Sequence, residues 1–500
     1  MSVQDGTTAG STQTPADEQA GLLPGEQAAE AAIRAHTSPS RARLELLVVG
    51  IGALAVSMSQ TLLVPVLSTL PETLGASSAD VEWLLTATLL VAAVSVPVLG
   101  RLGDMFGKRR MLLVSLSALV VGSVITGLTD NLGLLILGRG IQGVSFGAIP
   151  LGISLLSTLL PRERVGSAIA LISAMLGVGG ALALPIGGLI GEHTDYHALF
   201  WLTAVIGSIA LALTVAIVPE SPVRNPGRID VVGTLLLSAG LVAILLPLAQ
   251  SSSWGWTSGR TLGLLALGAV LVLVFGWTQT RIAEPLVDLQ ALRRTPIILT
   301  NIASVLFGFG LFASMIGTAG YLQAPETTGY GFGASIVFSG VCMLPGGLAM
   351  LVLSDLTATV IGRIGASRTL ALGAVILGAG WLMRIVATQQ LWMIVVGSAV
   401  VGIGAAVGYA AMPSLINEHT PPREIAAANG LNSLARSLGT SIASAVGGSL
   451  LAAHTVAVAA GPTTIELPSL GGYRLLFALC VVASLAAAFL ALAIPRRPAD

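Results

Sequence analysis

The chain has 500 residues, of which 54% are hydrophobic and 10% charged, and its mean hydropathy is +0.89. Soluble globular chains carry about 25% charged residues, so this composition excludes a water-soluble globular protein and indicates a surface that faces lipid. The 24 basic and 24 acidic side chains cancel, and this balance gives no reason to expect a nucleic-acid partner.

Residues 1–43 are rich in Gly, Thr, Gln, Ala and Glu and poor in aromatic side chains. Such a segment cannot bury enough apolar surface to fold, so we expect a disordered cytoplasmic tail. No basic stretch followed by an apolar run lies near Met1, and no cleaved signal peptide is expected.

Apolar runs of the length needed to cross a bilayer recur along the rest of the chain. A transmembrane helix needs about 20 such residues, and fourteen runs approach or exceed this length. They lie at 45–69, 82–100, 110–128, 132–160, 166–191, 198–218, 231–249, 261–279, 298–322, 333–360, 368–388, 391–415, 424–452 and 473–495. The sequence therefore predicts an all-α integral membrane protein with fourteen transmembrane helices.

The basic side chains test this count, because cytoplasmic loops of membrane proteins are enriched in Lys and Arg. If the N-terminus is cytoplasmic, 19 of the 24 basic residues lie in the tails and in the loops on that side. Of the other five, Arg260 and Arg474 lie on the outer side and three arginines lie within spans. We therefore expect both termini in the cytoplasm and the protein in the cell membrane.

Polar side chains inside spans are expensive in lipid and mark candidate sites. In the first span, Ser59 and Gln60 are candidates for a substrate cavity. At the outer end of the second span, Glu82 is a candidate proton carrier. The alternative for Glu82 is an interfacial acid at the start of a helix.

The segment 100–110 joins the second and third spans and contains five charged residues, three glycines and the only lysine of the chain. Glycine permits a sharp turn between antiparallel helices, an aspartate is stabilised near a helix N-terminus, and basic side chains anchor to the anionic leaflet. A generic turn on the positive side of the membrane is the alternative. The residues of interest are Gly100, Arg101, Gly103, Asp104, Gly107, Lys108, Arg109 and Arg110.

Arg139 lies about eight residues into the fourth span, and Gln142 follows one turn later. A charge at that depth indicates a functional or paired side chain. The alternative is an arginine that snorkels to the interface.

The fifth span contains a proline among glycines, at Gly180, Pro185, Gly187 and Gly188. Proline removes a helical hydrogen bond, and the glycines leave the helix deformable. Ordinary close packing between helices is the alternative.

Three more spans, in the second half of the chain, carry polar residues. Asp355, in the inner third of the tenth, is a candidate proton carrier, although it could instead face cytoplasmic water. Arg384 lies within a turn of the outer end of the eleventh and is expected to snorkel. In the thirteenth, Asn429, Asn432 and Arg436 are cavity candidates, the last two sharing a face by their i,i+4 spacing. A stripe that only holds neighbouring helices together is the alternative.

Three of these segments carry a recognisable pattern. Residues 100–110 read Gly-x-Leu-x-Asp-x-x-Gly-x-Arg-Arg, and residues 135–143 read Leu-x-x-x-Arg-x-x-Gln-Gly. The fifth span contains Leu184-Pro185-Ile186-Gly187-Gly188, a shortened form of Gly-Pro-x-x-Gly-Gly. Together with fourteen spans, these patterns resemble the major facilitator superfamily of transporters, and within it the 14-helix drug:proton antiporter group, over residues 44–495.

The resemblance implies six-helix bundles at 44–218 and 298–495, two additional helices at 219–297 and a short cytoplasmic tail at 496–500. In this family the aspartate of the 100–110 pattern, here Asp104, contacts the other half of the protein in the outward-open state. The pattern around Arg139 and Gln142 is linked there to proton coupling. The chain departs from the group at Ser59, where an aspartate usually stands.

The sequence therefore predicts a secondary transporter that exports small amphipathic compounds, such as drugs or antibiotics, in exchange for protons by alternating access. A proton-coupled or facilitative importer of a small metabolite on the same fold is the alternative. No span pairs His, Cys or carboxylates at the spacing of a metal site or catalytic triad, so no enzyme, cofactor or metal is expected. The expected partners are a small-molecule substrate, protons and the lipid bilayer, and we expect a monomer.

Overall fold

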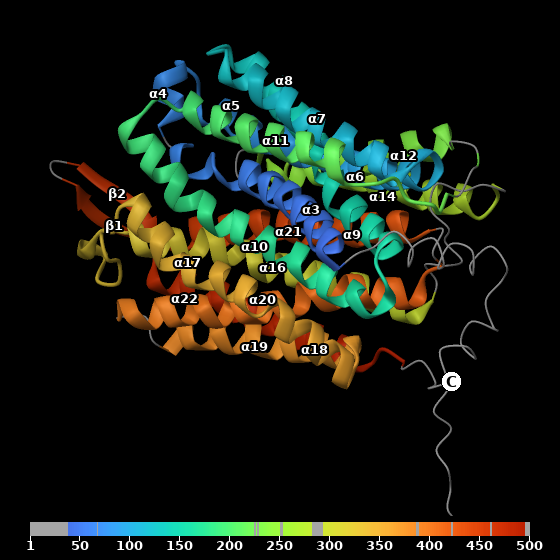
Figure 1. Cartoon of the computed structure of the whole chain (residues 1–500). Coiled ribbons are helices and arrows are strands. Elements are labelled where there is room, and N and C mark those ends of the chain that lie inside the picture. Colours follow the sequence, from blue (N-terminus) through green and yellow to red (C-terminus); the bar gives the residue numbers. More distant parts are fainter. Residues whose placement is uncertain are drawn as a thin grey trace, which may run out of the picture.

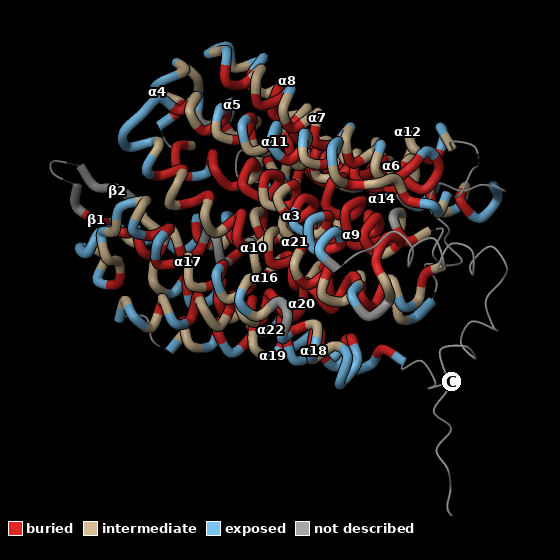
Figure 2. The backbone as a smooth tube through the Cα atoms, viewed as in Figure 1, coloured by how far each residue is buried: buried red, intermediate tan, exposed pale blue. Residues whose placement is uncertain are grey.

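The computed structural model describes residues 39–67, 69–224, 227, 230–250, 254–282, 294–386, 390–421, 424–460 and 463–495. Most of this part of the chain is helical, and the long helices run roughly side by side (Figure 1). Apolar side chains cover much of the outer surface, as at Leu128, Leu273 and Val352, which are 69%, 73% and 76% exposed. Figure 2 shows the buried backbone segments gathered inside this exposed rim. An apolar exterior of this kind suits contact with lipid.

The N-terminal bundle consists of six long helical segments. They are α3 (Pro39–Thr61), α6 (Trp83–Phe106), α7 (Lys108–Gly127), α8 (Leu132–Gly143) joined to α9 (Ala148–Leu159) by the 3-10 turn η2 (Val144–Gly147), α10 (Arg162–His193) and α11 (His197–Ile217). The short elements η1 (Val64–Val66), α4 (Leu70–Leu74) and α5 (Ser78–Val81) lie between α3 and α6. Buried apolar side chains from α3, α7, α9 and α10 form much of the core of this bundle.

The prediction that residues 1–43 are disordered is wrong for residues 39–43, because α3 already begins at Pro39. Proline is favoured in the first turn of a helix. Arg41 pairs with Glu45 one turn later, with Nε and Oε1 3.3 Å apart, and such a pair supports a helix. The rest of the expected tail, residues 1–38, lies outside the described residues.

The C-terminal bundle also consists of six long segments, one of them bent. They are α16 (Thr295–Gln323), α17 (Ile336–Val352) followed by α18 (Ser354–Ile364), α19 (Ala366–Val386), α20 (Leu391–His419), α21 (Ile425–Ala453) and α22 (Leu470–Leu492). The 3-10 turn η3 (Glu326–Thr328) follows α16. Phe307 and Trp381 are fully buried in the core of this bundle. In Figure 1, α7, α8 and α11 of the first bundle lie at the top, and α19 and α22 of the second lie at the bottom.

Two further helices, α12 (Val231–Ala249) and α14 (Gly259–Gln279), form a pair between the bundles in the sequence. The carboxylate of Asp230 caps α12 by accepting the N–H of Gly233 at 2.7 Å. Leu237 and Leu241 of α12 pack in one cluster with Ala93 of α6 and Leu434 of α21. The pair therefore lies beside the line along which α6 meets α21.

A β-hairpin between α21 and α22 departs from the all-α expectation. Strand β1 (Thr455–Ala460) pairs antiparallel with β2 (Thr463–Pro468), with Thr455 opposite Pro468. The hydroxyl of Tyr330, just after η3, donates a hydrogen bond to the carbonyl of Pro468 and so ties the hairpin to the C-terminal bundle. The β-branched residues of these strands favour extended structure, and the long apolar runs on either side obscure that signal.

Eleven helical segments among the described residues are long and apolar enough to cross a membrane, or twelve if α17 and α18, which meet at a bend of 55°, form one span. The eleven do not include α16 or α21. Polar residues such as Asn429, Asn432 and Arg436 lower the hydropathy of α21. The architecture is an all-α membrane fold, with fewer spans by this criterion than the fourteen expected from the sequence.

Close contact between α10 and α17 joins the two bundles. A Cβ added at Gly340 would lie 2.6 Å from the backbone nitrogen of Pro185, and one added at Gly347 would lie 2.2 Å from the Cβ of Ala181. Both positions favour glycine because the two helices approach too closely for a side chain on α17.

Candidate functional site

The turn between α6 and α7 consists of Gly107 alone, because α6 ends at Phe106 and α7 begins at Lys108. The expected loop over 100–110 is therefore wrong in extent, and most of its residues are helical. Gly107 has φ +121°, which favours glycine. A Cβ at this position would also lie 2.6 Å from Oε2 of Glu220. Glycine at position 107 therefore allows both the turn and the close contact with the carboxylate of Glu220.

Glu220, which follows α11, caps the N-terminus of α7. Its Oε1 accepts the N–H of Arg109 at 2.9 Å, and its Oε2 accepts the N–H of Arg110 at 3.3 Å. The guanidinium of Arg109 in turn donates to the carbonyl of Val215 at 2.7 Å. A carboxylate at a helix N-terminus is stabilised by the unpaired N–H groups and the helix dipole. Glu220 could not be predicted as a partner of this helix, because it lies 111 residues from Arg109 in the chain.

Asp104 is buried where the two bundles meet, with a relative exposure of 1%. Its Oδ2 accepts the backbone N–H of Ala427, near the start of α21, at 3.1 Å. Its Oδ1 lies 3.6 Å from Nζ of Lys108, which is also buried. Because the first turn of a helix presents unpaired N–H groups and a positive dipole, a carboxylate is well placed there. Asp104 therefore links the N-terminal bundle to the C-terminal bundle.

A second polar link joins the bundles at the same end of the molecule. The side-chain amide of Asn417 on α20 donates to Oγ of Ser157 on α9 at 3.0 Å. Its carbonyl oxygen accepts from Nδ2 of Asn429 on α21 at 2.7 Å. The cavity candidate Asn429 is thus engaged in the junction between the bundles. Neither Asn417 nor Ser157 was singled out from the sequence, since single polar residues near helix ends are common.

Arg139 is buried inside the N-terminal bundle, with a relative exposure of 1%. Its Nε donates to the carbonyl of Leu84 on α6 at 3.1 Å, and its Nη1 donates to the carbonyl of Ser59 on α3 at 3.0 Å. The same Nη1 donates to Oε1 of Gln142 at 2.7 Å, and Gln142 donates to Oγ of Ser123 on α7 at 2.8 Å. The guanidinium therefore ties α8 to α6 and α3, and Gln142 ties it to α7.

Ser59 stands directly beside this guanidinium, at the position where the resemblance led us to expect an aspartate. The hydroxyl of Ser59 and Nη2 of Arg139 are both buried, and neither has a hydrogen-bond partner among the described residues. The described ion pairs involve Glu45, Asp104, Asp130 and Asp195, so none of them reaches Arg139.

Arg436 and Asn432 form a polar cluster that bridges α21, α16 and α20. The amide of Asn432 donates to Oδ1 of Asn301 at 3.0 Å and to Oγ of Ser304 at 2.7 Å, both on α16. Nη1 of Arg436 donates to Oδ1 of Asn432 at 2.8 Å, so the two side chains share one face of α21. Cζ of Arg436 lies 5.2 Å from the ring centroid of Tyr409 on α20, a cation–π geometry.

The other predicted polar residues lie apart from these clusters. Gln60 is half-buried near the end of α3, and Glu82 is half-buried at the N-cap position of α6, where it makes no capping hydrogen bond. Asp355 belongs to the first turn of α18, and its side chain lies outside the described residues. Gly100 is buried and Arg101 half-buried near the end of α6.

The predicted deformation site lies in α10, which runs unbroken from Arg162 to His193 through Pro185. A Cβ at Gly187 would lie 2.5 Å from the carbonyl oxygen of Leu62, and one at Gly188 would lie 3.0 Å from Ile336. These contacts favour close packing as the reason for both glycines. Gly180 leaves room for a Cβ at ordinary contact distance, 3.4 Å from Oγ of Ser57.

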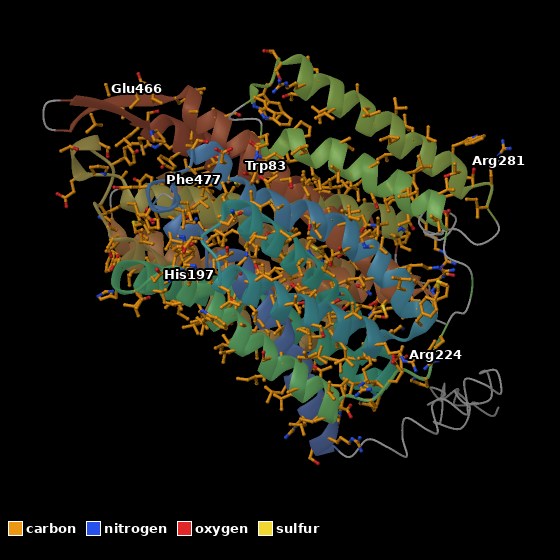
Figure 3. The ribbon with its side chains drawn as sticks, turned by 90° about the horizontal axis from the view of Figure 1, so that it is seen from above. Trp83, His197, Arg224, Arg281, Glu466 and Phe477 are labelled. Carbon is orange, nitrogen blue, oxygen red and sulfur yellow. The ribbon has the colours of Figure 1, made fainter. Side chains whose placement is uncertain are left out.

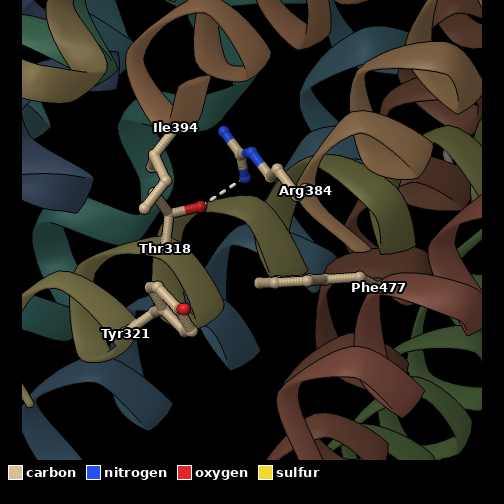
Figure 4. A pocket seen from close by; sticks show the side chains of 5 residues that line it. All are labelled: Thr318, Tyr321, Arg384, Ile394 and Phe477. Carbon is tan, nitrogen blue, oxygen red and sulfur yellow. Dashed lines mark hydrogen bonds between the residues drawn. The ribbon is translucent and has the colours of Figure 1, made fainter. Parts of the chain in front are cut away.

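The expectation that Arg384 snorkels is wrong, since its relative exposure is 3%. It donates hydrogen bonds to the hydroxyl of Thr318 on α16 and, at 2.8 Å, to that of Ser398 on α20. Its Cζ lies 4.8 Å from the ring centroid of Trp381. Arg384 also lines a small pocket with Thr318, Tyr321, Ile394 and Phe477 (Figure 4).

Two linked helical bundles with apolar exteriors and buried polar clusters define a multi-pass helical membrane protein. The chain belongs to the Major Facilitator Superfamily, because the sequence model of this family matches residues 49–362 and 347–500. It is accordingly a membrane-spanning transporter of small molecules. The span criterion supports eleven or twelve crossings of the membrane among the described residues.

Several characterised proteins are similar along most of their length. The chain is 30% identical to the tetracenomycin C resistance and export protein of Streptomyces glaucescens, over 84% of this chain and 78% of that protein. It is 29% identical to the puromycin resistance protein pur8 of Streptomyces alboniger, over 89% and 90% respectively. It is 26% identical to the multidrug resistance protein Stp of Mycobacterium tuberculosis (strain ATCC 25618 / H37Rv), over 82% and 76%.

Among solved structures, the human organic anion transporter MFSD10 (TETRAN) matches with a TM-score of 0.63. The match covers 91% of this chain and 100% of that chain, at 15% sequence identity. At this identity the likeness concerns the fold alone.

Proposed function

We propose that this chain exports small amphipathic compounds, such as drugs or antibiotics, in exchange for protons. The relatives named for tetracenomycin C export, puromycin resistance and multidrug resistance support an export function. The hydrogen bond from Ala427 to Asp104 carries the mechanism, because a junction made through one carboxylate can break and re-form in each cycle.

Alternating access would proceed by rocking of the two bundles. The Asp104–Ala427 and Ser157–Asn417 links join the bundles at the end that we expect to be cytoplasmic. With these links formed, that end is held shut, and substrate would exchange with the outside. Opening toward the cytoplasm would require both links to separate while α10 and α17 stay in contact.

Fourteen membrane crossings are part of the proposal, with α16, α21 and the bent pair α17–α18 crossing in addition to the eleven segments above. Arg224 and Arg281 lie at one end of the molecule, and His197 and Glu466 lie at the other (Figure 3). Since basic loops face the cytoplasm, the end with the two arginines would be cytoplasmic, as would both termini. The bundles would comprise residues 44–218 and 298–495, with 219–297 between them, and a monomer would suffice because one chain supplies both halves.

Proton coupling would involve the cluster of Arg139 and Gln142. With serine at position 59, no described carboxylate pairs with Arg139. Proton uptake and release would then fall to Glu82 near the outer end and Asp355 near the inner end, because membrane-embedded carboxylates are the usual carriers.

The test uses everted membrane vesicles from cells that express the full chain, with puromycin and tetracenomycin C as probes. We expect an acid interior to drive accumulation of at least one compound above the level reached in vesicles lacking the chain. Accumulation that survives collapse of the pH gradient would refute proton antiport and leave export standing. Absence of accumulation, together with unchanged drug sensitivity of the cells, would refute export.

A further inference from the structure

Three arginines lie inside the predicted spans, but at different depths. Arg384 is two residues from the end of α19, and Arg139 is the eighth residue of α8, so both belong to the outer part of their bundles in the expected topology. Arg436 lies eleven residues after the start of α21, which is about 16 Å along the helix axis. That is half of a hydrocarbon layer about 30 Å thick. In the fourteen-span arrangement proposed above, Arg436 therefore lies near the midplane, where transporters built from two such halves hold their substrates.

The positive charge of Arg436 is not compensated by any described acid. Its two hydrogen bonds within the described chain, to Oδ1 of Asn432 at 2.8 Å and to Oγ of Ser433 at 2.7 Å, use two of its five N–H donors. Both acceptors are neutral, and its third partner is the ring of Tyr409. None of the ion pairs found among the described residues includes it.

An unpaired charge inside a membrane protein is costly, and an anionic ligand would compensate it. A guanidinium presents a planar fork of donors that matches a carboxylate in charge and in shape. A cationic ligand would instead add a second positive charge to the same apolar region, and like charges at close range strongly oppose binding. Arg436 thus discriminates between ligands by the sign of their charge.

Arg436 and Tyr409 also face the junction between the two halves. The carbonyl of Tyr409 accepts a hydrogen bond from Oγ of Ser173 on α10 at 3.1 Å. The Tyr409 side chain packs in one cluster with Ala174 of α10 and Met350 of α17. Arg436 is 8% exposed in this conformation, and separation of α10 from α20 would uncover its guanidinium. Its apolar and aromatic surroundings suit an aromatic ligand.

We propose that the compound carried by this chain is an aromatic organic anion, whose carboxylate or phenolate binds Arg436 at the junction of α10, α20 and α21. This inference rests on the export function proposed above and adds the chemical class of the substrate. Aromatic cations of the same shape are rejected at this site.

Two fluorescent dyes with the same xanthene ring system test the sign of the charge directly: fluorescein is an anion at neutral pH and rhodamine 6G is a cation. Everted vesicles containing the full chain are energised with an acid interior, filtered, and lysed at neutral pH before the dye is measured. We expect accumulation of fluorescein and not of rhodamine 6G. Passive distribution of a weak acid would lower fluorescein inside an acid vesicle, so accumulation reports transport.

Variants at Arg436 identify the site. Arg436→Gln should lower fluorescein accumulation about tenfold or more, because a charge-assisted hydrogen bond is lost. Arg436→Lys should fall between this variant and the wild type, since it keeps the charge but not the planar fork. Arg281→Gln is the matched control, because Cζ of Arg281 also lies 5.2 Å from an aromatic ring centroid, that of Trp277, but Arg281 is exposed just after the end of α14. It should transport like the wild type.

Folding of each variant is checked by thermal unfolding in detergent. If Arg436→Gln does not fold, two results still test the inference: the dye preference of the wild type, and the lower fluorescein accumulation of Arg436→Lys compared with the wild type. Accumulation of rhodamine 6G alone, or of fluorescein equally by the wild type and folded Arg436→Gln, overturns the inference while export stands. Accumulation of neither dye also overturns the inference. If the cells in addition retain puromycin and tetracenomycin C, the proposed export function is refuted as well.

Discussion

Replacing Asp104 with asparagine removes one negative charge from the junction between the two bundles. Oδ2 of Asp104 accepts the N–H of Ala427 at 3.1 Å, and Oδ1 lies 3.6 Å from Nζ of Lys108. Only the first contact joins the bundles, because Lys108 lies one turn further along in the same bundle. An amide oxygen can still accept the N–H of Ala427, so Asp104→Asn keeps the geometry and removes the charge.

The size of the effect follows from these contacts. A hydrogen bond to a charged group contributes about 1.5–3 kcal/mol and a neutral one about 0.5–1.5 kcal/mol, so the substitution costs about 1–1.5 kcal/mol at Ala427. The lost attraction to the positive end of α21 adds about 0.3–1 kcal/mol. Together these favour the cytoplasm-open conformation by about 1.5–2.5 kcal/mol, or roughly 10- to 60-fold at 1.4 kcal/mol per tenfold. The unpaired Lys108 lowers the stability of both conformations alike.

Hydrogen–deuterium exchange at the start of α21 measures this shift, because the N–H of Ala427 exchanges when the junction opens. Asp104→Asn should raise the exchange rate of a peptide covering 425–430 by a similar factor and slow drug export. Asp230→Asn is the matched control, since Asp230 caps α12 through Gly233 within the described structure and asparagine caps equally well. Unchanged exchange and unchanged export in Asp104→Asn, at equal abundance, would refute a role for this charge in closing the junction.

Three further substitutions test the surroundings of this junction and the site of the missing acid. Gly107→Ala should lower the free energy of unfolding by about 1–3 kcal/mol from backbone strain alone, measured by thermal unfolding in detergent. Gly166→Ala is the control and should leave the free energy of unfolding unchanged, because no atom lies within 4 Å of the added Cβ. Equal unfolding midpoints for the two variants would show that Gly107→Ala introduces no backbone strain. Glu220→Gln should cost about 1 kcal/mol by weakening the cap of α7, and a wild-type midpoint would show that the cap contributes nothing. Ser59→Asp places a carboxylate beside Arg139 and should increase transport of cationic rhodamine 6G relative to fluorescein, whereas an unchanged dye ratio would show that position 59 does not select charge.

Hydropathy predicts the positions of the helices closely, because backbone groups in lipid must be satisfied within the segment itself. The runs at 198–218 and 231–249 correspond to α11 (His197–Ile217) and α12 (Val231–Ala249) within a residue. The prediction weakens where the chain leaves the lipid. There α3 begins at Pro39 instead of near 45, and a β-hairpin stands in a segment read only as a connection.

The candidate site was predictable in its charges but not in its partners. Asp104 is recognisable from its pattern, yet its partner is a backbone N–H 323 residues away that has no sequence signature. For Arg384 the sequence correctly places the side chain within a turn of the end of its helix, α19. The buried orientation of Arg384 depends on how α19 packs against α16 and α20, and this packing cannot be read from the sequence of one helix. The i,i+4 face of Asn432 and Arg436 was predictable because it is a property of one helix.

The single lysine of the chain can serve as a chemical probe of the junction between the bundles. Lys108 is the only residue with an ε-amino group, and that group is fully buried beside Asp104. Reagents that acylate amines need a solvent-accessible, unprotonated amine, so they should leave Lys108 unmodified while the junction with α21 is closed. Acylation of Lys108 would then show that the junction had opened toward the cytoplasm. This measurement needs no label to be introduced into the native chain.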